Sequence, residues 1–201
     1  MSHPDELPEL TPEQRASMTE SEIVTYEDLR EMGPVERVRF LGQAKIVSVA
    51  NTFIESVFEE GQLKPVWPLV DPILRLALAQ KWVLDNAASF DGTDFNRDDV
   101  ASALADEDPD HPLWVHFERV HVRSIKAVIP AERGIGTATR LEGPDVEMLY
   151  LHDQAGREGS TWQPGEERQV FPIAMRYSGE GWRIASFGSE TLPVPGWPPS
   201  F

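Results

Sequence analysis

Three histidines, His111, His116 and His121, recur every five residues and are the first candidates for metal ligands. Five residues correspond to about 140° of rotation on a helix and to opposite faces on a strand, so neighbouring imidazoles do not converge in either case. Glu118 and His121 have the Glu-x-x-His spacing of di-iron helical bundles, but the chain has no second copy of it. We therefore expect no metal site at these positions.

A second candidate resembles the start of a calcium-binding loop, with Asp94, Asn96 and Asp98 at the first three ligand positions. Asp99 stands where that loop needs a glycine, and Ala105 stands where it needs a bidentate glutamate. These residues fit the start of a helix better, with Asn96 as its N-terminal cap.

Motifs for nucleotides and for nucleophilic catalysis are missing. Gly134-Ile135-Gly136 has Thr139 in place of the third glycine of a dinucleotide fingerprint, and it does not precede a predicted helix. The sequence has no phosphate-binding loop and no G-x-S-x-G motif. It also has no cysteine, which excludes disulfides, thiolate metal sites and cysteine nucleophiles. We expect no cofactor.

A group of aromatic, histidine and methionine side chains could instead line a pocket for a small molecule. Most lie on two predicted strands, where alternation puts every second residue on one face, and that face lines a concavity if the sheet curls. The same residue types also suit an ordinary core. The predicted pocket residues are Trp82, His121, Met148, Tyr150, His152, Phe171, Met175 and Tyr177.

Three helices are predicted ahead of these strands. Apolar residues at steps of three and four predict a helix over residues 34–60, which ends at Gly61. Asp71, followed by a proline, predicts the start of a second helix that is apolar almost all round. Asn96 predicts the start of a short third helix.

Beyond Pro112, short β-branched and aromatic runs separated by proline and glycine predict strands. The runs are residues 120–122, 125–129, 136–141, 146–152, 170–177 and 182–187. The tight link between the last two predicts a hairpin, and strands that follow one another closely pair antiparallel. We therefore expect an α+β fold, with the helices packed on one face of a strongly curved antiparallel sheet.

This order of elements resembles the NTF2-like superfamily, of the SnoaL and ketosteroid-isomerase type. Residues 181–188 read Gly-Trp-Arg-Ile-Ala-Ser-Phe-Gly, which is similar to the Trp-[Arg/Lys]-[Ile/Val] last strand of that family. The resemblance covers residues 34–190 and implies a cone-shaped fold, a hydrophobic interior and frequently a homodimer through the sheet face. It implies no single reaction and transfers no catalytic residue, because the family includes isomerases, cyclases, dehydratases and binding modules.

The formal charge of −16 comes from 34 acidic and 18 basic residues, concentrated in two segments. Residues 1–31 carry nine acids and two bases, and residues 85–110 carry nine acids and one base. An acidic chain without a basic face argues against a general nucleic-acid-binding role. No apolar run is long enough to span a membrane, and no targeting segment precedes the domain, so we expect a cytoplasmic protein without a membrane partner.

Composition divides the chain into three parts. Residues 1–31 are expected to form an acidic, largely disordered tail. Residues 32–190 are expected to form the NTF2-like α+β domain. Residues 191–201 are a Pro/Trp-rich extension that Trp197 and Phe201 could pin to the body, and the alternative is a polyproline segment that binds a partner.

Several functions are compatible with these features. The favoured one is a non-catalytic domain that binds a small hydrophobic molecule or a protein partner through its cone and sheet. The alternative is a cofactor-independent isomerase, cyclase or dehydratase acting on a hydrophobic substrate. In that enzyme His121 or His152 would be the general base, and Tyr150 or Tyr177 would donate a hydrogen bond to a developing oxyanion. A third hypothesis is that the acidic tail binds a basic partner.

Overall fold

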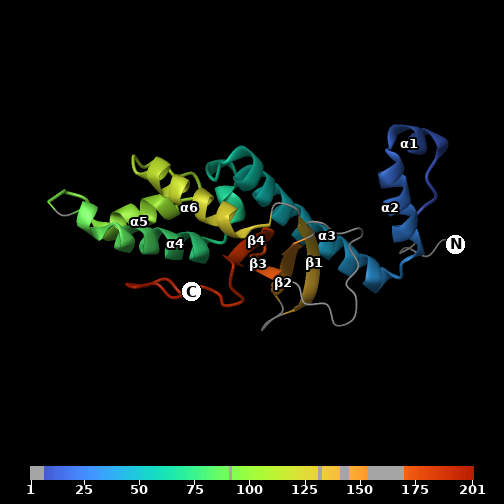
Figure 1. The fold of residues 1–201 in the computed structure, drawn as a ribbon. Coiled ribbons are helices and arrows are strands. Elements are labelled where there is room, and N and C mark those ends of the chain that lie inside the picture. Colours follow the sequence, from blue (N-terminus) through green and yellow to red (C-terminus); the bar gives the residue numbers. More distant parts are fainter. Residues whose placement is uncertain (1–6, 91, 131–132, 141–144, 154–169) are drawn as a thin grey trace. The chain divides into compact units, whose positions relative to one another are not determined.

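The structure is a computed structural model of the chain, and it describes residues 7–90, 92–130, 133–140, 145–153 and 170–201. These residues form an α+β protein in which helices precede a four-stranded antiparallel sheet (Figure 1). The chain divides into two compact units, residues 1–45 and residues 46–201. The candidate sites lie in the second unit.

The first unit contains α1 (Pro12–Ser17), α2 (Glu20–Glu31) and the beginning of α3 (Pro34–Ile54). The composition predicts a largely disordered tail over residues 1–31, and α1 and α2 lie within this segment. Thr11 and Thr19 cap α1 and α2, and each forms a capping box with the residue three positions later. No side chain of α1 is buried, so the local signals that favour this helix are its caps.

The helices of the second unit confirm the predicted helix end at Gly61 and the predicted helix starts at Asp71 and Asn96. The end of α3 continues as a π-helical turn, Glu55–Glu60, which stops at Gly61 in a left-handed conformation with φ of 74°. After a 3-10 helix, Lys64–Leu69, Asp71 caps α4 (Pro72–Asp85) by accepting from the Ile73 amide. A 3-10 turn, Ala87–Ser89, follows, and Asn96 then caps α5 (Arg97–Ala105).

The prediction of strands at residues 120–122 and 125–129 is wrong. Both runs belong to one helix, α6 (Trp114–Val128). Ile129, the last residue of the second run, is the C-cap of this helix. The buried side chains of α6 are Trp114, Phe117, Val122 and Ile125. The last three are three, eight and eleven positions after Trp114, so all four lie on one side of the helix. The helical period of burial outweighed the strand preference of the β-branched residues.

The sheet consists of β1 (Arg133–Arg140), β2 (Val146–Asp153), β3 (Val170–Tyr177) and β4 (Trp182–Phe187), paired antiparallel in the order β1-β2-β3-β4. This confirms the predicted meander and its final hairpin. The four described strands form an open sheet, with β1 and β4 at its edges. At the β4 edge, Val70 forms a parallel bridge with Ile184, and the Asp71 amide donates to the Ile184 carbonyl at 2.8 Å.

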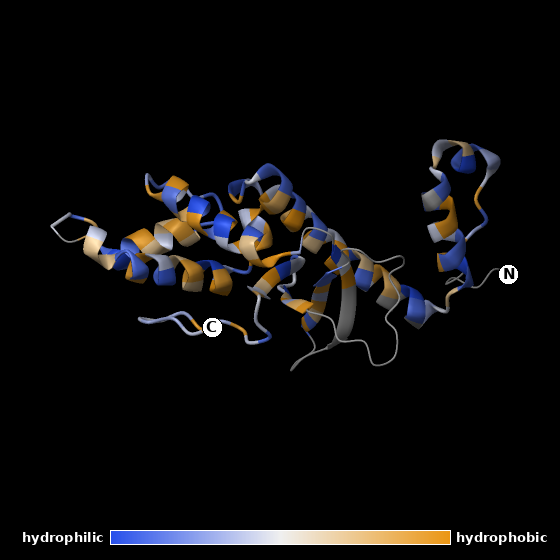
Figure 2. Cartoon of the chain, in the orientation of Figure 1, coloured by the Kyte–Doolittle hydropathy of each residue, from blue (hydrophilic) through white to orange (hydrophobic). Residues whose placement is uncertain are grey.

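The main core lies between one face of the sheet and the helices of the second unit. The ring of Phe53, near the end of α3, stacks on Phe187 of β4 with 5.3 Å between ring centroids. Trp67 makes edge contacts with Trp114 and Phe117 at 5.4 and 5.5 Å, which joins the 3-10 helix to α6. Figure 2 shows hydrophobic and hydrophilic residues alternating along α4 and α6, as expected of helices buried on one side.

The second face of the sheet is covered within the chain at its centre. Met148, Ala174 and Ala185 are each at most 1% exposed, and Leu192 of the C-terminal extension packs against them. Met148 of β2 and Ala174 of β3 therefore face away from the main core.

The C-terminal extension is pinned to the helices, as predicted from Trp197. The Trp197 indole N–H donates to Asp98 at 2.7 Å, and the Arg97 guanidinium lies over the indole at 4.7 Å from its centroid. The Gly196 amide also donates to the Gln80 side chain at 2.8 Å. Phe201 is exposed, so the contacts that hold the extension come from the residues before it.

Candidate functional site

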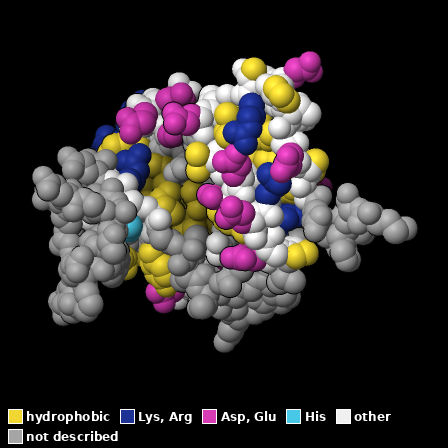
Figure 3. Space-filling model, turned by 90° about the vertical axis from the view of Figure 1, so that its right-hand side faces the viewer, with side chains coloured by type: hydrophobic (Ala, Val, Ile, Leu, Met, Phe, Trp, Pro, Cys, Tyr) yellow, Lys and Arg dark blue, Asp and Glu magenta, His cyan; other side chains and the backbone are white. Residues whose placement is uncertain are grey.

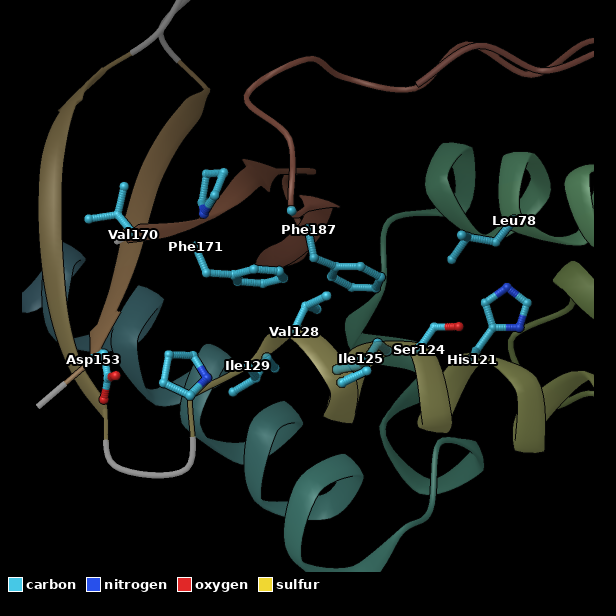
Figure 4. Close-up of a pocket in the computed structure, with 14 residues that line it drawn as sticks. Leu78, His121, Ser124, Ile125, Val128, Ile129, Asp153, Val170, Phe171 and Phe187 are labelled. Atoms are coloured by element: carbon cyan, nitrogen blue, oxygen red, sulfur yellow. The ribbon is translucent and has the colours of Figure 1, made fainter. Parts of the chain in front are cut away.

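The candidate site is a pocket of about 730 Å³ between the second half of α6 and one end of the sheet, which we call the helix–sheet pocket (Figure 4). One wall comes from α6 and the residues after it, with Leu78 of α4 beside them. The other wall comes from the end of β2, the start of β3 and the end of β4. The lining residues are Leu78, His121, Ser124, Ile125, Ala127, Val128, Ile129, Pro130, Asp153, Val170, Phe171, Pro172, Phe187 and Gly188.

The apolar part of this pocket is formed by two phenylalanines that face α6. Phe171 and Phe187 reach from β3 and β4 toward Ile125 and Val128 (Figure 4). Gly188 permits this arrangement for two reasons. Its φ of 75° is one that other residues rarely adopt, and a Cβ at this position would lie 3.2 Å from the Phe171 ring. The Gly188 amide also donates to the Pro172 carbonyl at 2.9 Å, which holds the two strand ends together.

His121 is the ionisable side chain of the helical wall. Its Nδ1 lies 2.9 Å from the Phe117 carbonyl oxygen, which can only accept, so Nδ1 carries the proton. In the neutral ring the lone pair is then on Nε2. Burial lowers the pKa of His121, and the Phe117 hydrogen bond and the charge of Asp85 oppose this only in part. The pocket therefore presents a neutral imidazole near physiological pH.

The structure brings together only part of the predicted site. His121 and Phe171 line the helix–sheet pocket, and Trp82 lines a separate pocket between α4 and α6. Met175 lies in the main core. The four remaining residues lie elsewhere. Met148, Tyr150 and His152 are on the second face of β2, and Tyr177 is exposed near the β3–β4 turn.

The register of β2 on β3 explains this separation. Leu149 pairs with Ile173, and Tyr150 pairs with Pro172. Residues paired across antiparallel strands share a face, so the set that includes Tyr150 and the set that includes Phe171 point to opposite sides of the sheet. Alternation within each strand was predicted correctly, and the phase between the two strands was wrong.

Neither predicted phenol lies in the helix–sheet pocket with His121. The Tyr150 hydroxyl donates to Glu190 at 2.9 Å, and this hydrogen bond raises the pKa of the phenol. The Tyr177 hydroxyl donates to the Gly179 carbonyl at 3.4 Å. His121 therefore has neither predicted phenol beside it in this pocket. The other predicted pair, His152 and Tyr150, lies on the second face of β2, outside this pocket.

Glu118, whose spacing to His121 suggested a metal site, binds the backbone instead. Its Oε1 accepts from the amides of Leu63 and Lys64 at 2.7 and 2.9 Å. Within the described part of the chain, no group of three His, Asp or Glu side chains is placed to hold a metal ion.

Sequence reasoning missed Ile125, Val128 and Phe187 as pocket residues. The first two fell in a predicted strand, and their helical spacing to His121 was the signal that could have placed them on one face of α6. Phe187 ends the last strand, and only its register opposite Ile173 puts it on the helical side of the sheet.

Charged residues of both signs are mixed on one face of the described part of the chain (Figure 3). On the face in Figure 3, the Asp and Glu side chains of the described residues lie among their Lys and Arg side chains, and these residues form no continuous basic surface there. Among the residues that the structure describes, no helix is long and apolar enough to cross a membrane. The chain matches no protein-family model, no curated protein and no solved structure. Fold and site thus define an α+β protein with an open pocket between a helix and a sheet.

Proposed function

We propose that residues 46–201 form a binding domain for a small hydrophobic molecule, which occupies the helix–sheet pocket. The observation that carries this proposal is the pocket itself. Its volume of about 730 Å³ lies within the range of small-molecule sites, roughly 300 to 1,000 Å³. Its walls are largely aliphatic and aromatic, and a few polar groups could orient a ligand.

The exposure of two valines at this pocket supports the proposal. Val128 is 57% exposed and Val170 is 39% exposed, and both line the pocket from opposite walls. A ligand that covers them would remove apolar surface from water, worth about 25 cal/mol for each Å² buried. A neutral His121 adds one hydrogen-bond acceptor without the cost of burying a charge.

The NTF2-like resemblance remains part of this proposal. It is supported by α3, α4 and α5, which precede the antiparallel meander and its final hairpin in the expected order. Helix α6, in place of two expected strands, is a departure from the expected arrangement. We restrict the proposal to a small molecule, because the centre of the second sheet face is buried within the chain and offers no apolar surface for a dimer partner.

The experiment is a titration with N-phenyl-1-naphthylamine, a neutral apolar probe whose fluorescence rises on transfer out of water. We expect saturable binding by the wild-type protein and a loss of affinity of about tenfold or more in Val128→Trp, which fills the pocket mouth. Val115→Trp is the matched control, because Val115 is on the same helix, is also 57% exposed and does not line this pocket. Equal affinity in both variants would exclude the helix–sheet pocket as the binding site.

A further inference from the structure

A second pocket, on another side of α6, has a different chemistry. It has a volume of about 540 Å³ and lies between the end of α4, the segment after it and the first half of α6. Its aromatic part is a chain of edge contacts. The Trp82 and Phe90 rings are 6.1 Å apart, and the Phe90 and Phe95 rings are 6.3 Å apart. Phe95 is 47% exposed. We call this the aromatic pocket.

The opposite wall of the aromatic pocket carries two cations. Arg119 and Arg123 are one helical turn apart on α6, and both line the pocket. Among the described residues, neither guanidinium forms an ion pair with a carboxylate, although the chain has a formal charge of −16. Two unpaired guanidinium groups beside an exposed aromatic ring are an arrangement suited to an organic anion, because arginine binds carboxylates through two parallel hydrogen bonds.

The pocket also includes a donor without a partner. The indole N–H of Trp82 is buried and has no acceptor within the described structure, and the side chain is only 6% exposed. A buried N–H without an acceptor costs about 1 to 3 kcal/mol. Because this nitrogen is itself buried, a ligand oxygen could reach it only if the Trp82 side chain shifted toward the pocket.

The surroundings argue for a small monoanion over a polyanion. Five residues between 86 and 95 line the aromatic pocket, and they belong to an acidic segment, residues 85–110, with nine acids and one base. Asp98 and Asp99 lie in the first turn of α5, close in sequence to Phe95. A nucleic acid would extend into this acidic region and be repelled, whereas a single carboxylate between Arg119 and Arg123 would not need to.

We propose that the aromatic pocket is a binding site for an aryl carboxylate, whose ring packs against Phe90 and Phe95 and whose carboxylate pairs with Arg119 and Arg123. This site is separate from the helix–sheet pocket, since the two share no lining residue. It therefore adds a second ligand class to the one proposed above.

The test compares 2-naphthoate with 2-naphthamide, which has the same ring system and no charge, by isothermal titration calorimetry. We expect 2-naphthoate to bind the wild-type protein about tenfold or more tighter than 2-naphthamide. Replacing both Arg119 and Arg123 by Gln should abolish this difference. The control is the double variant Lys64→Gln and Lys81→Gln, which changes the net charge equally at exposed positions outside the pocket and should retain the difference.

A steric variant separates this proposal from the first. Val120 is 48% exposed and lines the aromatic pocket alone of the two pockets, so Val120→Trp should abolish 2-naphthoate binding and leave N-phenyl-1-naphthylamine binding intact. Val128→Trp should have the reverse effect. Circular dichroism verifies that each variant is folded. The proposal would be overturned if 2-naphthoate and 2-naphthamide bound the wild-type protein equally well, or if 2-naphthoate did not bind at millimolar concentration. It would also be overturned if Val128→Trp abolished 2-naphthoate binding and Val120→Trp retained it.

Discussion

The carboxylate of Asp71 accepts a hydrogen bond from the guanidinium of Arg176 at 3.1 Å, which ties the N-terminus of α4 to β3 across the domain. The same Asp71 oxygen also accepts from the Ile73 amide, so one buried carboxylate both caps the helix and pairs with the sheet. The sequence showed the cap and gave no indication of the ion pair, because Arg176 lies more than a hundred positions away.

We predict that Asp71→Ala lowers the free energy of unfolding by about 2 to 4 kcal/mol, since it removes a cap and leaves a partly buried arginine unpaired. Asp71→Asn should cost less, because asparagine keeps the cap and loses only the charge. Urea denaturation measures both. The control is Asp85→Ala, which breaks the exposed pair with Lys81 and should cost no more than about 0.5 kcal/mol. Similar losses for Asp71→Ala and Asp85→Ala would contradict this account.

Glu118 offers a second stability test, because its carboxylate accepts from two amides at the start of the 3-10 helix. Leu63 is buried, so its N–H cannot turn to water when the acceptor is removed. We expect Glu118→Ala to destabilise the protein by about 1 to 3 kcal/mol. Glu118→Gln keeps a side-chain oxygen and should lose less than half of that. Thermal unfolding of the two variants measures the difference, and an equally small loss in both would show that these bonds contribute little.

The C-terminal extension should detach when Trp197 is changed. Trp197→Ala removes the hydrogen bond to Asp98, the contact with Arg97 and the packing against the core. We expect a loss of about 1 to 3 kcal/mol and faster proteolysis after residue 190. Trp197→Phe keeps an aromatic ring and should fall between Trp197→Ala and wild type. Phe201→Ala, at an exposed position, is the control and should be cleaved at the wild-type rate.

The depressed pKa of His121 predicts a dependence of stability on pH. The unfolded chain has an ordinary histidine pKa of about 6.5, so on acidification it takes up a proton before the folded protein does. Proton uptake by the unfolded state destabilises the folded one, so His121 contributes a loss of stability as the pH falls below about 6.5, down to the lowered folded pKa. Above pH 6.5 the contribution is constant.

We therefore expect His121→Gln to lose less free energy of unfolding than the wild type between pH 7.5 and pH 5, as measured by urea denaturation at each pH. Ser124→Ala changes the same pocket without removing a titratable group and should follow the wild type. If His121→Gln follows the wild type as well, the imidazole is not desolvated in the folded protein.

Local signals in the sequence predicted the local structure well. Asp71, Asn96 and Gly61 mark helix ends through their own side chains or backbone conformation, and the structure confirms each one. The meander and hairpin could also be predicted, because short links between strands leave antiparallel pairing as the simple solution. The capping boxes at Thr11 and Thr19 are equally local, but the prediction for residues 1–31 was based on composition and did not use them.

The candidate site could not be predicted to the same extent, because it depends on relationships between elements. The β-branched residues of α6 gave a strand prediction, and this removed Ile125 and Val128 from the set that could face His121. The prediction that Tyr150 and Phe171 share one face of the sheet is wrong. Which residues of β2 and β3 share a face depends on the pairing register, and neither strand sequence specifies that register alone. The aromatic pocket combines α4, α6 and the segment between α4 and α5, and no single motif spans them.

The bridge between Val70 and Ile184 has a consequence for association between chains. An edge strand presents unpaired amides and carbonyls that can template a strand from another molecule. At the β4 edge, the Ile184 carbonyl is already used by the Asp71 amide, and the backbone at Val70 lies alongside the strand. A foreign strand cannot pair with the middle of β4 unless this connection opens first. The chain segment that leads into α4 thus also covers the middle of the β4 edge and blocks β-strand pairing with another molecule there.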